Sequence, residues 1–301
     1  MEQAILKTLI YADIFDYPLK AYEIHKWLIG RKAILRQVEK ALQRLSQKGK
    51  VKSKLGYYFL PGKSRLVAKR LKRENESKKF FRKAKSVVWF LKFIPYIKLI
   101  GISGGVAMEN ADKTDDIDLF IITSKNGLWL TRILITTFLN SMGVRRKAGM
   151  KLSQVAGKLC LNILLEEDRL AQNKADIYLA HEVLQMKVLW QRNGIYQKYL
   201  EDNQWVFEFL PNWVGGARGP ASSRSRRASS IANAPAATRR EPFSLSPLAD
   251  LLENLAKKFQ LKIMKKPVGM ERIQDGALYF HPNDRRGEVL KEYKARIKTI
   301  P

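Results

Sequence analysis

One stretch of this 301-residue chain decides its fold: Ile102-Ser103-Gly104-Gly105-Val106-Ala107-Met108-Glu109-Asn110-Ala111-Asp112-Lys113-Thr114-Asp115-Asp116-Ile117-Asp118-Leu119. An apolar strand is expected to enter the Gly-Gly turn, and a loop then leads to Asp-x-Asp at the start of a second strand. Because strand side chains alternate in direction, Asp116 and Asp118 are expected on one face. Two converging carboxylates repel each other unless a cation lies between them, and Mg²⁺ prefers carboxylate oxygens and brings phosphates with it. Gly104 and Gly105 allow close approach of the backbone to a phosphate.

Strands and helices alternate around this stretch, which indicates an α+β core with a mixed sheet. Apolar runs predict strands over 98–103, 118–123 and 159–165, and a helix over 128–142 that ends at Gly143. The predicted core therefore spans residues 98–172.

Residues 1–62 predict a small unit with three short helices followed by a β-hairpin, which is the order of a winged helix-turn-helix. In a DNA-reading version the third helix would enter the major groove. The same polar residues also suit the solvated face of a structural helix, so both interpretations stay open. The residues concerned are Arg31, Lys32, Arg36, Gln37, Lys40 and Arg44.

The rest of the chain is predicted to be mostly helical, with one exception. Residues 63–97 form a basic connector helix, and 173–213 form a helical extension with helices over 175–189 and 196–210. Residues 214–245 are rich in Gly, Ala, Ser, Pro and Arg and predict a flexible basic linker. Residues 246–301 predict a C-terminal helical segment with a short extended piece at 278–282.

Composition restricts the classes of function. The formal net charge of +28 favours an anionic partner, while 46% hydrophobic residues can fill a core. The single cysteine, Cys160, excludes an intramolecular disulfide and is expected to be a buried small hydrophobe. His25, His181 and His281 lack metal-ligand spacing. Without a signal peptide pattern or an uninterrupted apolar span, the protein is expected to be cytoplasmic, with no membrane partner.

The glycine turn and the Asp-x-Asp motif together resemble the signature of the polymerase-beta-like nucleotidyltransferase superfamily. Ser103-Gly104-Gly105 and Asp116-Ile117-Asp118-Leu119 match it, over roughly residues 98–166. The whole chain also resembles an uncharacterised bacterial group in which a winged-helix-like N-terminus precedes this domain. The stretches that carry this wider resemblance are 11–18, 56–62 and 180–185.

The resemblance implies Mg²⁺-dependent transfer, with Mn²⁺ as an alternative ion, of a nucleoside monophosphate from a nucleoside triphosphate to an acceptor hydroxyl. Asp116 and Asp118 would hold the ions, and Ser103, Gly104 and Gly105 would contact the phosphates. The acceptor could be RNA or another nucleic acid, a protein side chain or a small molecule, and the positive charge favours an anionic one.

The family usually has a third acidic residue on a later strand, and here the inward polar position of the predicted strand is Asn162. An amide cannot accept a proton at neutral pH and binds Mg²⁺ more weakly than a carboxylate. Glu166 or Glu167 could substitute from the strand end, where a solvated terminus explains them equally well.

Two other functions therefore stay open: a catalytically degenerate, nucleic-acid-binding regulator, and a toxin–antitoxin-like partner of another protein. His181 and Glu182 on a predicted helix would either line the substrate cleft or pack inside the fold. Oligomeric state does not follow from the sequence.

Overall fold

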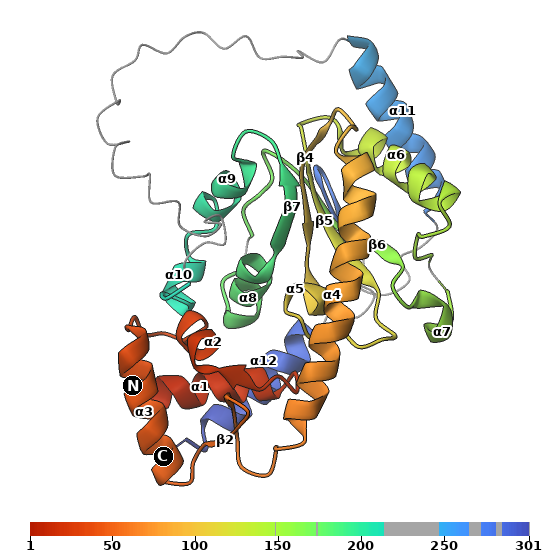
Figure 1. Cartoon of the computed structure of the whole chain (residues 1–301). Coiled ribbons are helices and arrows are strands. Elements are labelled where there is room, and N and C mark those ends of the chain that lie inside the picture. The colour runs from red at the N-terminus through yellow and green to blue at the C-terminus, as the bar shows by residue number, and fades with distance from the viewer. Residues whose placement is uncertain (148, 173, 214–246, 265–271, 281–284, 301) are drawn as a thin grey trace, which may run out of the picture.

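The computed structural model describes residues 1–147, 149–172, 174–213, 247–264, 272–280 and 285–300. The predicted linker at 214–245 and His281 lie outside these residues. The described chain is an α+β fold with a three-stranded sheet and a mixed six-stranded sheet, as predicted (Figure 1). None of its described helices is long and apolar enough to cross a membrane.

The N-terminal unit contains the helices and the hairpin that its sequence predicts. Its sheet has the order β1-β3-β2, with both pairs antiparallel. Apolar residues at helical spacing, including Leu9, Val38 and Leu42, form its buried centre. The elements are α1 (Glu2–Asp13), β1 (Leu19–Lys20), α2 (Ala21–Lys26), α3 (Leu35–Gln47), β2 (Lys52–Lys54) and β3 (Tyr57–Phe59).

The larger sheet has the strand order β7-β4-β5-β6-β9-β8. Strands β5 and β6 are parallel, and every other neighbouring pair is antiparallel. Its centre is almost entirely apolar, as expected for strands covered on both faces. The strands are β4 (Ile97–Ile102), β5 (Ile117–Thr123), β6 (Leu159–Glu166), β7 (Lys187–Gln191), β8 (Arg272–Gln274) and β9 (Ala277–Tyr279).

Helices cover both faces of this sheet (Figure 1). Long helix α4 (Leu66–Leu91) packs on one face together with α6 (Leu128–Ser141) and α11 (Pro247–Ile263). The other face carries α8 (Ile177–Gln185), α9 (Ile195–Glu201), α10 (Val206–Phe209) and α12 (Arg286–Ile297). Two short helices, α5 (Gly104–Ala107) and α7 (Leu152–Val155), lie in the connections.

The larger sheet extends beyond the predicted core at both edges. Residues 187–189 were expected to end the helix over 175–189, but the helix stops at Gln185 and residues 187–191 pair with the free edge of β4. At the other edge the predicted C-terminal helical segment contributes β8 and β9. In both places the unsatisfied hydrogen-bonding groups of an edge strand recruit a segment that is distant in sequence, an effect that local periodicity does not reveal.

The predicted helix over 196–210 is also interrupted, and Asn203 is the reason. This side chain is fully buried between α9 and α10. Its amide nitrogen donates to the carbonyls of Leu170 and Tyr199, and its oxygen accepts from the amide of Gln172. A buried side chain that satisfies backbone groups in this way competes with a continuous helix.

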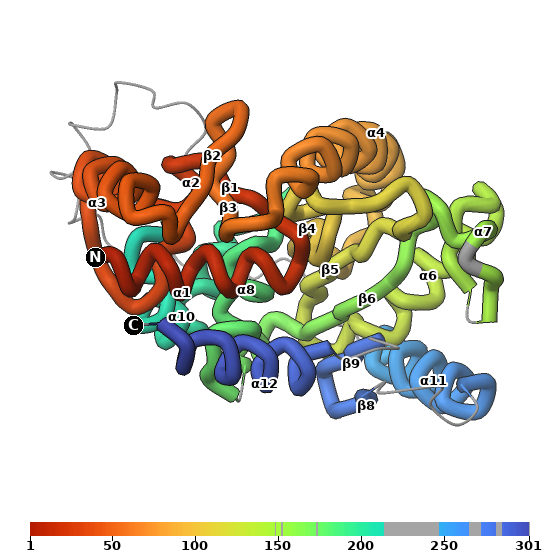
Figure 2. Tube along the Cα trace, turned by 90° about the horizontal axis from the view of Figure 1, so that it is seen from below, coloured from red at the N-terminus to blue at the C-terminus, as the bar shows by residue number. Residues whose placement is uncertain are grey.

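The N-terminal unit shares a hydrophobic core with the larger sheet. Tyr11 and Trp27 pack in the same cluster as Phe120 of β5 and Ala180 of α8. Helix α1 also lies beside α12 from the other end of the chain (Figure 2), where Arg296 forms an ion pair with buried Asp13. The two parts of the fold are therefore held in a fixed relation by packing.

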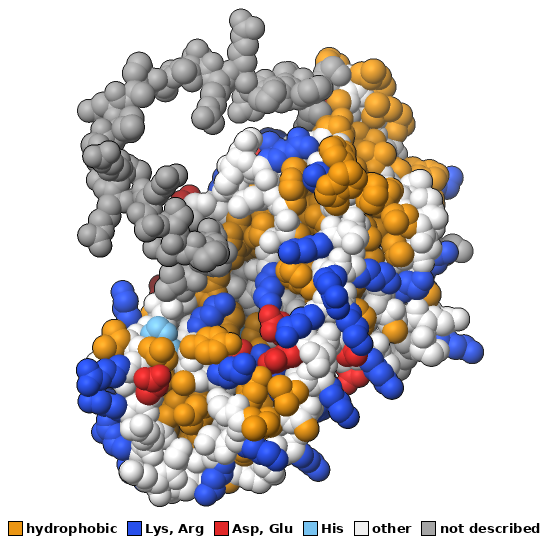
Figure 3. Space-filling view, viewed as in Figure 1, with side chains coloured by type: hydrophobic (Ala, Val, Ile, Leu, Met, Phe, Trp, Pro, Cys, Tyr) orange, Lys and Arg blue, Asp and Glu red, His pale blue; other side chains and the backbone are white. Residues whose placement is uncertain are grey.

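Exposed apolar and basic side chains occupy different parts of the surface. On the face in Figure 3, apolar side chains gather over the end formed by α11 and α6, while Lys and Arg are spread over much of the remainder. The exposed large apolar residues of α11 are Leu248, Leu251, Leu252, Leu255, Phe259, Leu261 and Ile263.

Candidate functional site

The two carboxylates of the Asp-x-Asp motif converge at the start of β5. Asp118 is the second residue of the strand and Asp116 immediately precedes it. The parallel register of β5 and β6 places Cys160 opposite Asp118. One carboxylate oxygen from each aspartate and the Cys160 Sγ atom all lie within 4.8 Å of one another.

Cys160, rather than Asn162, therefore takes the neighbouring-strand position beside the aspartates. Leu161 pairs with Leu119 and Ile163 pairs with Phe120, so Asn162 is the extra residue of a β-bulge. Glu166 pairs with Thr123, five residues beyond Asp118 and roughly 16 Å along the strand. Neither Glu166 nor its neighbour can complete a three-carboxylate site.

Among the described residues, one ion pair, between Arg146 and Asp116, offsets the negative charge of the site. Arg146 Nη1 donates to Asp116 Oδ2 at 2.7 Å, and the Arg146 amide donates to the Leu159 carbonyl, which fixes this segment beside β6. Burial, with the nearby charges of Asp116 and Glu182, raises the pKa of Asp118 well above its usual range. Burial, with the two aspartates, also raises the pKa of the Cys160 thiol. The thiol is therefore protonated, and the carboxylate pair is where a cation would relieve repulsion.

Gly104 packs directly against Asp118. Its φ of +63° lies in the left-handed region, and a Cβ added there would lie 2.6 Å from Asp118 Oδ2. The Ser103 amide donates to the Asp118 carbonyl at 3.0 Å, which ties the turn to β5. Among the described residues, the amides of Gly104 and Gly105 meet no acceptor, and the buried Ser103 Oγ has no hydrogen-bond partner. The turn thus presents unsatisfied donors beside the carboxylates.

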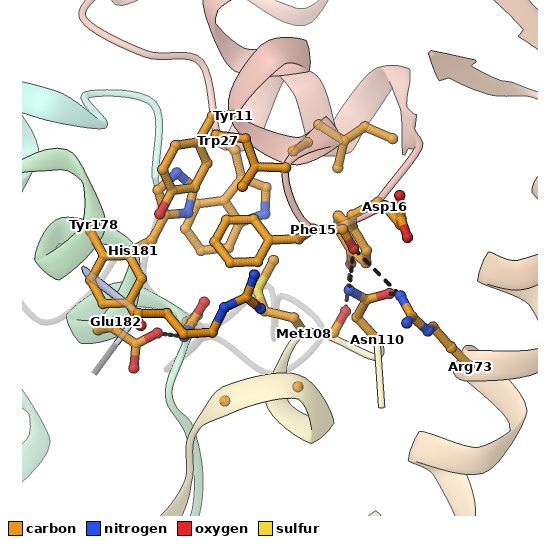
Figure 4. Close-up of a pocket in the computed structure, with 18 of the residues that line it drawn as sticks. Tyr11, Phe15, Asp16, Trp27, Arg73, Met108, Asn110, Tyr178, His181 and Glu182 are labelled. Atoms are coloured by element: carbon orange, nitrogen blue, oxygen red, sulfur yellow. Dashed lines mark hydrogen bonds between the residues drawn. The ribbon is translucent and has the colours of Figure 1, made fainter. Parts of the chain in front are cut away.

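Two cavities flank this turn. The first, of about 500 Å³, lies between the N-terminal unit, α5 and α8 and is lined by Gly104 and Gly105 (Figure 4). The second, of about 470 Å³, lies over the sheet and is lined by Ser103 and Phe120. Glu182 lines both cavities, and His181 lines the first. His181 is buried and stacks on Tyr11 and Trp27, as expected for packing inside the fold. Both residues also line a cavity, and a substrate role for that cavity stays a prediction.

Several residues of this region carry no signal in the sequence. Arg146 is one of two adjacent arginines, which carry no recognisable motif, and Cys160 was expected only to be a buried small hydrophobe. Both reach the aspartates through the register of β6, which a single sequence does not specify. The His181-Glu182 pair offered the one usable signal, because polar residues interrupted an otherwise apolar helix face.

Comparison of the chain with protein-family models, with curated proteins and with solved structures finds no match. The carboxylate pair, the glycine turn and the two cavities are therefore the features that indicate a function.

Proposed function

We propose that this protein is a divalent-cation-dependent nucleotidyltransferase that transfers a nucleoside monophosphate from a nucleoside triphosphate to an acceptor hydroxyl. The observation that carries the proposal is the convergence of Asp116 and Asp118 against the Gly104 backbone. Carboxylate oxygens beside a glycine turn support the proposal, because transfer from a triphosphate requires cation ligands close to donors for phosphate oxygens.

Two of the three candidate metal ligands fit Mg²⁺. Carboxylate oxygens of Asp116 and Asp118 are the hard ligands that Mg²⁺ prefers, whereas the protonated Cys160 thiol is not one. The aspartates would therefore hold the ion, with water and phosphate oxygens as its other ligands. A bound ion would supply charge neutralisation at the phosphates.

The protein's own groups account for binding and orientation. The amides of Gly104 and Gly105 and the Ser103 hydroxyl would donate to phosphate oxygens. The acceptor oxygen bonds to the α-phosphorus as the bond from that phosphorus to the bridging oxygen breaks, and pyrophosphate leaves. Glu182, which lines both cavities, would take the acceptor's proton.

Incubation with labelled nucleoside triphosphates, Mg²⁺ or Mn²⁺, and a pool of RNA, protein and small-molecule acceptors tests the proposal. Transfer is expected from the wild type and should be lost in Asp116→Asn/Asp118→Asn. Asp250→Asn, which alters an aspartate of α11 that lines neither cavity, is the matched control. Absence of transfer to every acceptor, or transfer that survives the double substitution, would contradict the proposal.

The exposed basic side chains of α3 favour a second candidate, a nucleic-acid-binding regulator. Arg36, Lys40 and Arg44 are all exposed on this helix. Binding to duplex DNA that weakens steeply with salt, and weakens further in Lys40→Ala/Arg44→Ala, would support this candidate. The same binding should survive Asp116→Asn/Asp118→Asn, which separates the two functions.

A further inference from the structure

The cavity beside Gly104 and Gly105 is built jointly by parts of the chain that are far apart in sequence. Figure 4 shows Tyr11, Phe15 and Trp27 entering from the N-terminal unit, Tyr178 and His181 from α8, and Arg73 from α4. Its volume of about 500 Å³ is in the range of small-ligand sites. The N-terminal unit therefore forms part of the wall of this cavity.

One wall of the cavity is a rigid stack of three flat rings. His181 lies between Tyr11, at 4.3 Å between ring centroids and 12° between planes, and Trp27, at 4.9 Å and 27°. All three are buried, and the buried His181 Nε2 atom has no hydrogen-bond partner among the described residues. A wall of stacked flat rings matches a ligand that itself has a flat ring.

Phe15 and Tyr178 are the two partly exposed rings of the lining, and they enter from different elements (Figure 4). Phe15 is held at its backbone, because its carbonyl accepts hydrogen bonds from Asn110 Nδ2 at 3.0 Å and from Arg73 Nη1 at 3.4 Å. A preorganised aromatic face of this kind suits stacking by a nucleobase.

The cavity also contains groups for an anion. Arg285 is exposed at the lining, with its guanidinium 5.9 Å from the Phe15 ring centroid. Within the described residues no carboxylate lies within ion-pair distance of Arg285. Gly104 and Gly105 line the same space. Aromatic, polar and cationic groups are thus combined in one cavity of small-molecule size.

We infer that this cavity binds a single nucleotide unit, with its base against Phe15 and its phosphate near Arg285. The unit is either a free mononucleotide or the terminal nucleotide of an RNA strand, which share this chemistry. That the bound nucleotide is a substrate rests on the proposed function, whereas its binding does not. The N-terminal unit would then act in substrate binding.

Direct binding of AMP, GMP, CMP and UMP to the full chain, measured by calorimetry with EDTA present, tests the inference without turnover or a metal ion. At least one should bind the wild type. Phe15→Ala should weaken that binding about tenfold or more through loss of stacking. Phe93→Ala, which removes an exposed aromatic ring from the segment after α4, is the matched control and should bind like the wild type.

Arg285→Ala provides a second variant on an exposed side chain, so that misfolding cannot explain the result. It should weaken binding of the monophosphate and leave binding of the corresponding nucleoside unchanged. Failure of all four monophosphates to bind at millimolar concentration, or binding that Phe15→Ala leaves unaltered, would overturn the inference.

Two further binding experiments separate this inference from the proposed function and identify the source of the nucleotide. Asp116→Asn/Asp118→Asn should bind the monophosphate as the wild type does, even if no transfer is ever detected. Competition by a short single-stranded RNA, lost when its terminal nucleotide is made abasic, would identify a strand end. Competition by free mononucleotides alone would identify a small molecule.

Discussion

Replacement of Gly104 by alanine tests whether the glycine turn positions the carboxylate pair. The new Cβ would lie 2.6 Å from Asp118 Oδ2, and ordinary contact begins at 3.4 Å. The carboxylate or the turn must therefore shift by 0.8 Å, the difference between these two distances. A displacement of about 1 Å in a reacting group costs about 100-fold in rate, or about 2.7 kcal/mol of transition-state stabilisation.

Gly143→Ala is the matched control for this experiment. Gly143 has the same φ of +63°, and a Cβ there would meet nothing within 4 Å. Both variants should lose about 1 kcal/mol of unfolding free energy through the left-handed conformation, measured by urea denaturation. Only Gly104→Ala should also lose nucleotidyl transfer and Mn²⁺ binding, the latter followed by electron paramagnetic resonance.

The comparison of the two alanine variants can refute the reasoning. If Gly104→Ala transfers label and binds Mn²⁺ within about twofold of Gly143→Ala, the absence of a side chain at this turn does not position Asp118. A loss of activity in both variants would instead show that overall stability, rather than the contact with Asp118, governs the site.

Three further predictions concern proton transfer, pH and the C-terminal segment. Glu182→Gln should lower the rate of transfer about 100-fold, while exposed Glu201→Gln leaves it unchanged, as measured by single-turnover kinetics. Burial lowers the pKa of His181 from 6.5 to about 3, so the unfolded state takes up a proton first as pH falls below 6.5. Between pH 6.5 and 5 the wild type should therefore lose about 1.6 kcal/mol more unfolding free energy than His181→Phe; equal losses in urea titrations would contradict this. The Glu253 carboxylate on α11 accepts from the Trp129 and Leu130 amides at the start of α6, at 2.6 and 2.8 Å. Glu253→Ala should cost about 2 kcal/mol in thermal or urea unfolding, against no change for exposed Glu292→Ala.

Most secondary structure could be predicted from local patterns. The apolar spacing in 128–142 predicted α6, and the apolar run 159–165 predicted β6, because these patterns report which face of a segment is buried. Strand β7 was missed because its apolar spacing also fits a helix, and pairing with β4 decides between the two. When the apolar spacing of a segment fits both a helix and a strand, its conformation is decided by the segments that pack or pair with it.

Much of the candidate site could also be anticipated. Asp116 and Asp118 were expected to share a face, and their oxygens do converge, because alternation along a strand is a local property. The third position was assigned to Asn162 on the assumption of a regular strand. The register of β6 places Cys160 opposite Asp118, and a bulge follows at Asn162; neither is encoded in the alternation pattern of β6 itself.

Local sequence thus determined which segments are strands or helices and which two carboxylates point the same way, since short-range backbone geometry controls both. Tertiary structure decided which distant residues meet: Cys160 and Arg146 at the aspartates, and Phe15, Tyr178 and Arg285 around one cavity. These contacts depend on strand register and on packing between elements far apart in the chain. Both are set by the whole molecule rather than by any one segment.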